Sequence, residues 1–261
     1  MNIKRSIKLL FLYAKAGQMT SWEYRFGYFF RLIRIFMDFG IALVFINVFF
    51  SKTSSIGNWN QAEIFLVYAL FQMVNSTYNF FCGDSLNDLD YDVQKGKLDF
   101  SLLKPIDSQF IVSFKNTYPS NAYRVILSII VMIYAFGQLH LSFSPSIIVW
   151  GIISVISSTV IYYCLILLAS LSSFWTSRGE VTELMNTIFS VSKYPLDIFR
   201  KPTVQLLTFI PLIFLVTVPA RVILGKPDHL HYLSPFLAVA IFYISRKFWL
   251  LALRHYSSAS S

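Results

Sequence analysis

The sequence has little charge. Its 261 residues include only 22 Lys and Arg and 13 Asp and Glu, and 56% of them are hydrophobic. Soluble domains carry about 25% charged residues, whereas this chain carries 13%, which leaves too little polar surface for a water-soluble globule. Two cysteines exclude a disulfide scaffold, ten glycines exclude a collagen-like chain, and the high hydrophobicity excludes disorder. These absences leave an integral membrane protein.

Motifs of catalysis are also missing. The chain contains no G-x-x-x-x-G-K-[ST], no G-x-S-x-G and no H-E-x-x-H, and the pairs Gly96-Lys97 and Gly225-Lys226 lack the rest of a phosphate-binding loop. Cys82 and Cys164 have no His or acidic cluster nearby at ligand spacing, so they predict packing and not a metal site. We expect no enzyme, no catalytic residue, no metal ligand and no cofactor in this chain.

Long stretches lack any charge, and an ionised side chain at the bilayer centre costs at least about 2.5 kcal/mol. Residues 125–177 are uncharged when His140 is neutral, which is too long for one crossing of a core about 30 Å thick. The polar stretch 142–146 divides this region into predicted helices at about 125–140 and 147–175. Four further apolar segments run over 39–51, 64–83, 202–220 and 229–245. The sequence therefore predicts an all-α, polytopic membrane protein with six transmembrane helices in residues 35–261 and no soluble domain.

The distribution of Lys and Arg predicts the orientation of the chain. Of the 22, 19 fall in the N-terminal stretch, in the loop after the second span, in 178–201 and in the tail, whereas the alternate loops hold Lys52, Arg221 and Lys226. Cytoplasmic loops are enriched in these residues, so both termini are predicted to be cytoplasmic, in an inner or plasma membrane. The net charge of +9 then reflects topology and attraction to anionic lipid, not a nucleic-acid partner.

Residues 1–34 show two apolar stripes at helical spacing, with Lys and Arg on the opposite face. This pattern predicts amphipathic helices that lie in the lipid headgroup plane; a cytosolic helix pair that packs on a partner remains the alternative. The stripes consist of Ile3, Ile7, Leu10, Phe11 and Ala14 in the first helix and Trp22, Phe26, Phe29, Phe30 and Ile33 in the second.

Few polar residues fall inside the predicted spans. Asp38 is expected to pair with Arg34 one helical turn earlier, or to line a transport path. Asn75, Asn79 and Asn186 are expected either to hydrogen-bond between helices or to line that path. The sequence offers no proton relay, which argues against a secondary transporter.

The loop after the second span, predicted over residues 83–123, begins acidic and then becomes apolar. Gly96 ends a turn, and Leu98, Leu102 and Leu103 form an apolar edge before Pro105. A short amphipathic element with nothing of its own to bury against is suited to docking on another protein, and a solvated loop is the alternative reading.

At this loop the chain resembles ABC-2 permeases of ATP-binding-cassette transporters, more narrowly the branch of uncharacterised ABC-2 permease components. The pattern acidic-x-x-x-Gly-x-Leu-x-x-Leu-Leu-x-x-Pro is met by Asp92, Gly96, Leu98, Leu102 or Leu103, and Pro105. Two further motifs of that branch are Lys193-Tyr194-Pro195-Leu196-Asp197-Ile198-Phe199 and the terminal Arg254-His255-Tyr256-Ser257-Ser258-Ala259-Ser260.

The resemblance implies a permease subunit that exports or flips an amphipathic substrate. It further implies a dimer with a second, identical or different, permease subunit and two copies of a separate ATPase that binds ATP and Mg. The ATPase-coupling residues that it implies are Asp92, Gly96, Leu98, Asp99, Phe100, Leu102, Leu103 and Pro105. A channel or membrane scaffold that works without ATP and anchors a cytosolic partner through the same loop is the rival function.

The resemblance also implies a re-entrant hairpin over residues 202–224, with 181–199 as the fifth span, whereas hydropathy alone favours 203–224 as that span. In the hairpin arrangement Lys193 is expected to pair with Asp197 near the outer interface.

Overall fold

The computed structural model describes residues 3–23, 25–139, 141, 144–176, 179–199, 210–226 and 228–256. These residues form helices and turns, and they contain no strand beyond an isolated bridge between Ile56 and Trp59. The long helices are α1 (Ile3–Glu23), α2 (Arg25–Phe50), α3 (Gln61–Tyr78), α8 (Asn121–Leu139), α9 (Pro145–Ser170) and α14 (Leu230–His255). The all-α class is confirmed.

Shorter elements connect the long helices. After α3 come the π-helix η1 (Asn79–Gly83), α4 (Asp84–Asn87), α5 (Leu89–Gln94), α6 (Leu98–Leu102) and α7 (Ser108–Phe114). After α9 come α10 (Ser173–Thr176), α11 (Glu180–Ser190), the 3₁₀ turns η2 (Val191–Lys193), η3 (Leu196–Ile198) and η4 (Leu212–Phe214), and α13 (Thr217–Ile223).

Four helices of the described chain are long and apolar enough to cross a membrane. They are Phe26–Phe50, Asn121–Leu139, Pro145–Thr176 and Leu230–His255. The chain is therefore a multi-pass membrane protein, but the predicted count of six spans is not confirmed. The predicted second span corresponds to α3, and the predicted fifth span corresponds to α11, which at 11 residues is about 17 Å long and continues only as 3₁₀ turns.

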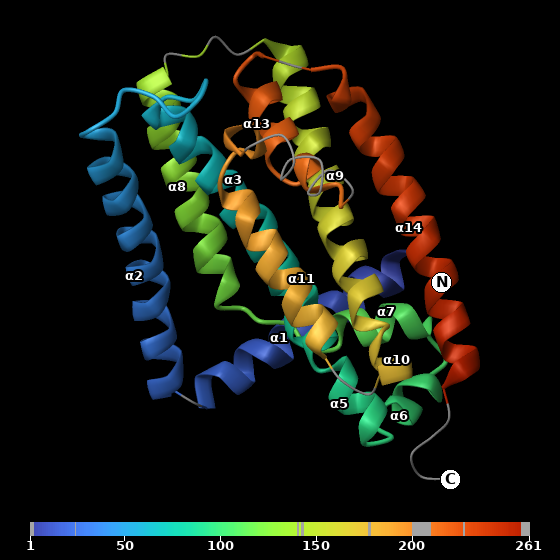
Figure 1. The fold of residues 1–261 in the computed structure, drawn as a ribbon. Helices are drawn as coiled ribbons and strands as arrows, with labels where there is room; N and C mark the ends of the chain where they lie inside the picture. Colours follow the sequence, from blue (N-terminus) through green and yellow to red (C-terminus); the bar gives the residue numbers. More distant parts are fainter. Residues whose placement is uncertain are drawn as a thin grey trace.

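The long helices run side by side, and two groups of short elements cover their ends (Figure 1). At one end lie α5, α6, α7, α10 and the last turns of α14, with α1 crossing the same end. At the other end lie the turn between α2 and α3 and helix α13. We call the group α4–α7 the cap.

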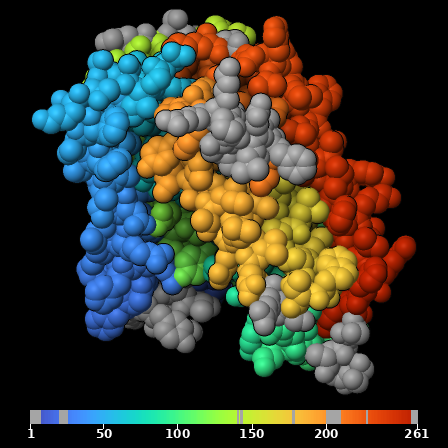
Figure 2. All heavy atoms as spheres, viewed as in Figure 1, coloured from blue at the N-terminus to red at the C-terminus, as the bar shows by residue number. Residues whose placement is uncertain are grey.

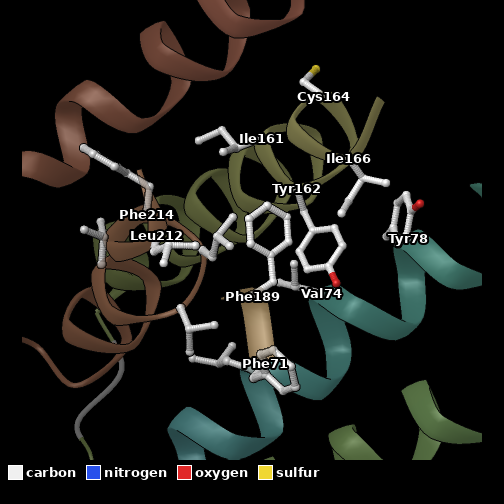
Figure 3. Close-up of a cluster of buried hydrophobic side chains, with 14 of the residues drawn as sticks. Phe71, Val74, Tyr78, Ile161, Tyr162, Cys164, Ile166, Phe189, Leu212 and Phe214 are labelled. Atoms are coloured by element: carbon white, nitrogen blue, oxygen red, sulfur yellow. The ribbon is translucent and has the colours of Figure 1, made fainter. Parts of the chain in front are cut away.

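Helix α3 forms the centre of the bundle, packed against α8 and α9, while α14 packs along the far side of α9. Figure 3 shows how α11 is fixed to this core: the ring of Phe189 points at Tyr162 of α9, with ring centroids 4.7 Å apart. Tyr162 in turn lies 4.9 Å from the ring of Tyr78. This aromatic cluster joins α3, α9 and α11 in the middle of the molecule.

The N-terminal boundary differs from the sequence prediction. Helix α2 runs without a break from Arg25 to Phe50, so the predicted boundary at residue 34 falls inside it. The second amphipathic stripe, apart from Trp22 in α1, is the first part of the first spanning helix. The reason is that nothing between Arg31 and Asp38 stops a helix, since the stretch contains neither Pro nor Gly. Apolar residues of both stripes are exposed, including Phe11, Phe26, Phe29 and Phe30; the side chains of Ile3, Ile7 and Trp22 lie outside the described residues.

The segment predicted as a re-entrant hairpin is described from residue 210 onward, and residues 200–209 lie outside the described residues. From Ile210 to Leu224 the chain forms η4 and α13, not one long helix. Helix α13 packs against α9 and α3, η4 packs against α9, and Ser158 of α9 donates a hydrogen bond of 2.6 Å to the carbonyl of Phe214. The re-entrant hairpin over residues 202–224 therefore stays a prediction.

Candidate functional site

The cap is built from short helices because the sequence interrupts each of them after one or two turns. The left-handed backbone of Gly96, with φ of 66°, separates α5 from α6, and residues with a Cβ adopt this conformation only at a cost. Asp107 begins α7 as its N-cap and accepts a hydrogen bond of 3.0 Å from the backbone N–H of Phe110.

Two anchors hold the cap together from inside. The Lys115 ammonium contacts the carboxylate of Asp92 across the cap, and the side chain of Asp92 is 8% exposed. Leu98, the first residue of α6, is fully buried in the apolar core. Asp92 therefore joins α5 to the end of α7, and Leu98 fixes α6 to the apolar core.

The outer surface of the cap is apolar despite its exposure. Phe100 is 72% exposed, Leu103 is 81% exposed, and Pro105 and Tyr91 of the cap are exposed as well. We call Tyr91, Phe100, Leu103 and Pro105 the tip surface. Exposed lysines at 95, 97 and 104 surround it, and the Lys97 ammonium lies 4.6 Å from the centre of the Tyr91 ring. Exposed apolar residues with a charged rim are typical of a protein–protein contact.

The residues of the predicted coupling motif thus divide into two groups. Asp92, Gly96 and Leu98 are buried and position α6, Asp99 and Leu102 are half-buried, and Phe100, Leu103 and Pro105 are exposed.

The cap is tied to the spanning helices at several points. Arg246 of α14 binds both carboxylate oxygens of Asp107, at 3.1 and 2.5 Å, and the indole N–H of Trp249 donates to Ser108 at 3.0 Å. On the other side, the Arg31 guanidinium of α2 lies 4.0 Å from the ring centre of Tyr118, which follows α7. The cap is therefore joined by side-chain contacts to α14 and to α2.

Burial changes the pKa of Asp84, which lies at the start of the cap. Desolvation raises the pKa of its carboxyl to about 6, the nearby carboxylate of Asp88 adds to the rise, and the Arg31 guanidinium opposes it. The side chain lies in a polar hollow between α1, α2 and the cap.

A second candidate feature is a cavity of about 520 Å³ among α2, α3, the start of α8 and the end of α11. Figure 2 shows the hollow on this face, between the blue α2 and the orange α11. Its walls include Asp38, Tyr68, Asn75, Arg124 and Lys193. We call it the polar cavity, because charged and amide groups line a space inside a bundle that is otherwise apolar.

Two of the four predicted path residues line this cavity, namely Asp38 and Asn75. Asn79 lies one turn further on and donates a hydrogen bond of 2.9 Å to the Asn75 carbonyl. Asn186 lies half-buried on α11 and is not among the residues that line the cavity.

Both predicted local ion pairs are wrong. Asp38 binds Arg124 of α8 at 2.6 Å instead of Arg34, and Asp197 binds Arg221 of α13 at 2.7 Å instead of Lys193. Each observed partner belongs to a neighbouring element, so each ion pair forms between two elements and not within one helix.

Sequence reasoning also missed three charged residues. Glu63 binds Lys226 at 2.7 Å, and Lys115, at the end of α7, binds Asp92. The low exposure of Glu63 has a local sequence signal, since Asn60 and Glu63 form a capping box at the start of α3. No local pattern marks Lys115 or Lys226, because their partners lie far away in the sequence.

Comparison with known proteins gives one result. The model of a family described as ABC-2 family transporter protein matches residues 36–260, which include the cap, the polar cavity and all the long helices except α1 and the first part of α2. No curated protein and no solved structure was found to match. The chain therefore belongs to the ABC-2 transporter family, as a membrane permease component of an ATP-binding-cassette transporter.

Proposed function

We propose that this permease exports an amphipathic substrate, or flips it from the cytoplasmic leaflet, with energy from a separate ATPase subunit present in two copies. A second permease subunit, identical or different, completes the transporter. Both termini and the cap face the cytoplasm in this proposal. The observation that carries it is the tip surface, because Phe100 and Leu103 are exposed on a helix whose position is fixed by buried residues.

The tip surface suits an ATPase groove for energetic reasons. Fully burying a Phe or Leu side chain is worth about 1.5–3 kcal/mol, and Phe100 and Leu103 are each more than 70% exposed in the free chain. Because α6 is already ordered by Leu98 and Asp92, docking costs little conformational entropy. Rim lysines at 95, 97 and 104 favour a partner surface that carries acidic residues.

The contacts of the cap suggest how ATP binding in the partner reaches the permease. A push on α6 moves α7, which pulls α14 through Asp107 and Arg246. The same push reaches α11, because its N-cap Gly179 packs closely against the Asp90 carboxylate of α5. A Cβ added at Gly179 would lie only 2.9 Å from that carboxylate. Helices α11 and α14 therefore shift when the cap shifts.

The polar cavity supports a transport path between α2, α3 and α11. Exposed polar residues of α11, including Glu183 and Thr187, extend this face toward the cap. Polar groups within a membrane avoid lipid and face protein or water, so this face is suited to the second permease subunit or to the substrate. Asp38, Asn75, Asn79 and Asn186 are our candidates for residues along the path or its gate.

The experiment is purification of the tagged chain in detergent, identification of the proteins that accompany it, and an ATPase assay on the complex. We expect a nucleotide-binding subunit and ATP hydrolysis that a substitution of the tip surface uncouples. Recovery of a cytosolic partner without ATPase activity would favour the scaffold or channel instead.

A further inference from the structure

A separate cavity of about 530 Å³ lies on another side of the molecule, bounded by η1 and the end of α3, by α7, by α9 and by α14. None of the described residues that line it belongs to α2 or α11, so it is distinct from the polar cavity. Its volume is in the range of about 300–1,000 Å³ that small-molecule sites occupy. We call it the lateral cavity.

Most of the wall of the lateral cavity is apolar. It contains the side chains of Phe81, Phe110, Phe114, Val160 and Phe242. Phe242 is 48% exposed on the outer face of α14, so the cavity opens sideways, toward the lipid that surrounds a spanning helix. An apolar space open to a bilayer accommodates an acyl chain at little cost.

One wall of the lateral cavity is polar, and its side chains are joined by hydrogen bonds. Arg246 binds Asp107 through both oxygens and Gln109 at 3.1 Å. Gln109, which is 4% exposed, donates to the hydroxyl of Tyr163 at 3.2 Å, and Ser113 lies 2.9 Å from the same hydroxyl.

This network leaves Arg246 able to bind an anion. A guanidinium has five N–H donors, and among the described residues Asp107 and Gln109 take up three of them. The Arg246 side chain is 34% exposed at the cavity. The Asp107 carboxylate balances its charge, and its two remaining N–H donors match the oxygens of a phosphate group in geometry.

The depth of Arg246 also fits a lipid headgroup. It lies 16 residues after Leu230, the start of α14, which is about 24 Å along the helix. A hydrocarbon core is about 30 Å thick. With Leu230 placed at the outer boundary of this core, Arg246 lies near the inner boundary and the apolar wall lies within the hydrocarbon region.

The backbone beside the cavity is unusual. Phe81 and Cys82 belong to the π-helix η1, and π-helices are rare and concentrate at functional sites. Here η1 turns the Phe81 side chain toward the cavity at the junction of α3 with the cap.

We propose that the lateral cavity binds one phospholipid of the cytoplasmic leaflet. An acyl chain lies along Phe81, Val160 and Phe242, and the phosphate binds Arg246. Since Asp107 begins α7 of the cap and Arg246 belongs to α14, the lipid occupies the junction at which the cap is joined to a spanning helix. The assignment to the cytoplasmic leaflet rests on the orientation proposed above, with the cap in the cytoplasm, but not on the direction or the substrate of transport.

The test is titration of the purified, delipidated full chain with palmitoyl-oleoyl phosphatidylglycerol, followed by native mass spectrometry. Val160→Phe places a larger side chain in the lateral cavity, where it obstructs the acyl-chain path along Phe81 and Phe242, and Val155→Phe on the same helix narrows the neighbouring apolar cavity between α3, α8 and α9 instead. We expect one tightly bound lipid in the unmodified chain and in Val155→Phe, and binding at least about tenfold weaker in Val160→Phe. Equal binding by the two variants, or no tightly bound lipid in the unmodified chain, would overturn the proposal.

The headgroup contact has its own matched pair. Arg246→Gln and Lys247→Gln each remove one positive charge from the same turn of α14, but only Arg246 lines the cavity. We expect about tenfold weaker binding in Arg246→Gln and little change in Lys247→Gln. A diacylglycerol with the same chains, which lacks the phosphate, should bind the unmodified chain as weakly as the phospholipid binds Arg246→Gln. This pair decides the matter if Val160→Phe does not fold, and equal loss in both charge variants contradicts the proposal.

Discussion

The first residue of helix α6, Leu98, and its C-cap, Leu103, have opposite environments, and this contrast gives the sharpest prediction. Leu98 is fully buried, whereas Leu103 is 81% exposed. Replacing a buried leucine by alanine costs about 2–5 kcal/mol of folding stability, so Leu98→Ala should lower the thermal stability of the isolated permease. Leu103→Ala removes the same atoms from an exposed site, where most substitutions change stability by less than about 0.5 kcal/mol.

The exposed residue Leu103, and not the buried Leu98, should contribute directly to ATPase binding. Fully burying a leucine contributes about 1.5–3 kcal/mol, and truncation to alanine retains part of that, so Leu103→Ala should lose about 1–2 kcal/mol of binding. This loss corresponds to a dissociation constant that is roughly 5- to 30-fold higher.

Thermal unfolding in detergent measures the first effect, and titration of the purified ATPase onto the immobilised permease measures the second. Leu98→Ala should unfold earlier. Leu103→Ala should unfold like the unmodified chain and bind the ATPase weakly. Unfolding of Leu103→Ala as early as that of Leu98→Ala, or undiminished ATPase binding by a folded Leu103→Ala, would refute the assignment of the tip surface.

Three further predictions concern the backbone, a buried carboxyl and an ion pair. Gly96→Val forces a β-branched residue to a φ of 66°, so we expect a loss of at least about 1–2 kcal/mol in stability and reduced coupling of ATP hydrolysis to transport; an unchanged melting temperature contradicts this. Because burial raises the pKa of Asp84 to about 6, above its value of about 4 in the unfolded chain, the folded state holds that proton more tightly and this group lowers stability as pH rises from 4 to 6. Asp84→Asn should therefore raise the melting temperature at pH 8 by more than at pH 5, and an equal gain at both values refutes the reasoning. A double-mutant cycle of Asp38→Asn with Arg124→Gln, read by thermal unfolding, should give a coupling of about 1 kcal/mol, whereas additive effects would show that the pair at 2.6 Å contributes nothing.

The absence of charge was enough to find the helices that lie in the apolar part of the bundle. The predicted segments at about 125–140 and 147–175 correspond to α8 and α9, and the polar break between them contains Ser144, the N-cap of α9, followed by Pro145 at its first turn. These features are local, so a single sequence reveals them.

What could not be foreseen depends on contacts between distant segments. The motif did not separate the buried Leu98 from the exposed Leu103, because the burial of a short helix is decided by the surface on which it packs. Likewise Asp38 pairs with Arg124, 86 residues further along the chain, and no pattern around either residue announces the other. The resemblance placed a span at 181–199, but the short length of α11, 11 residues, was not foreseen, because its anchor Phe189 packs on Tyr162 of another helix.

The most direct measurement is site-specific photo-crosslinking in cells. A benzophenone amino acid replaces Phe100 in the tip surface, and a control carries it in place of Phe236, which is 73% exposed on α14 at the opposite end from the cap. The account predicts a crosslink from position 100 to a nucleotide-binding ATPase subunit and none from position 236. A folded chain whose position 100 never crosslinks to such a subunit, or is labelled from outside the cell by a membrane-impermeant reagent after replacement by cysteine, would contradict it.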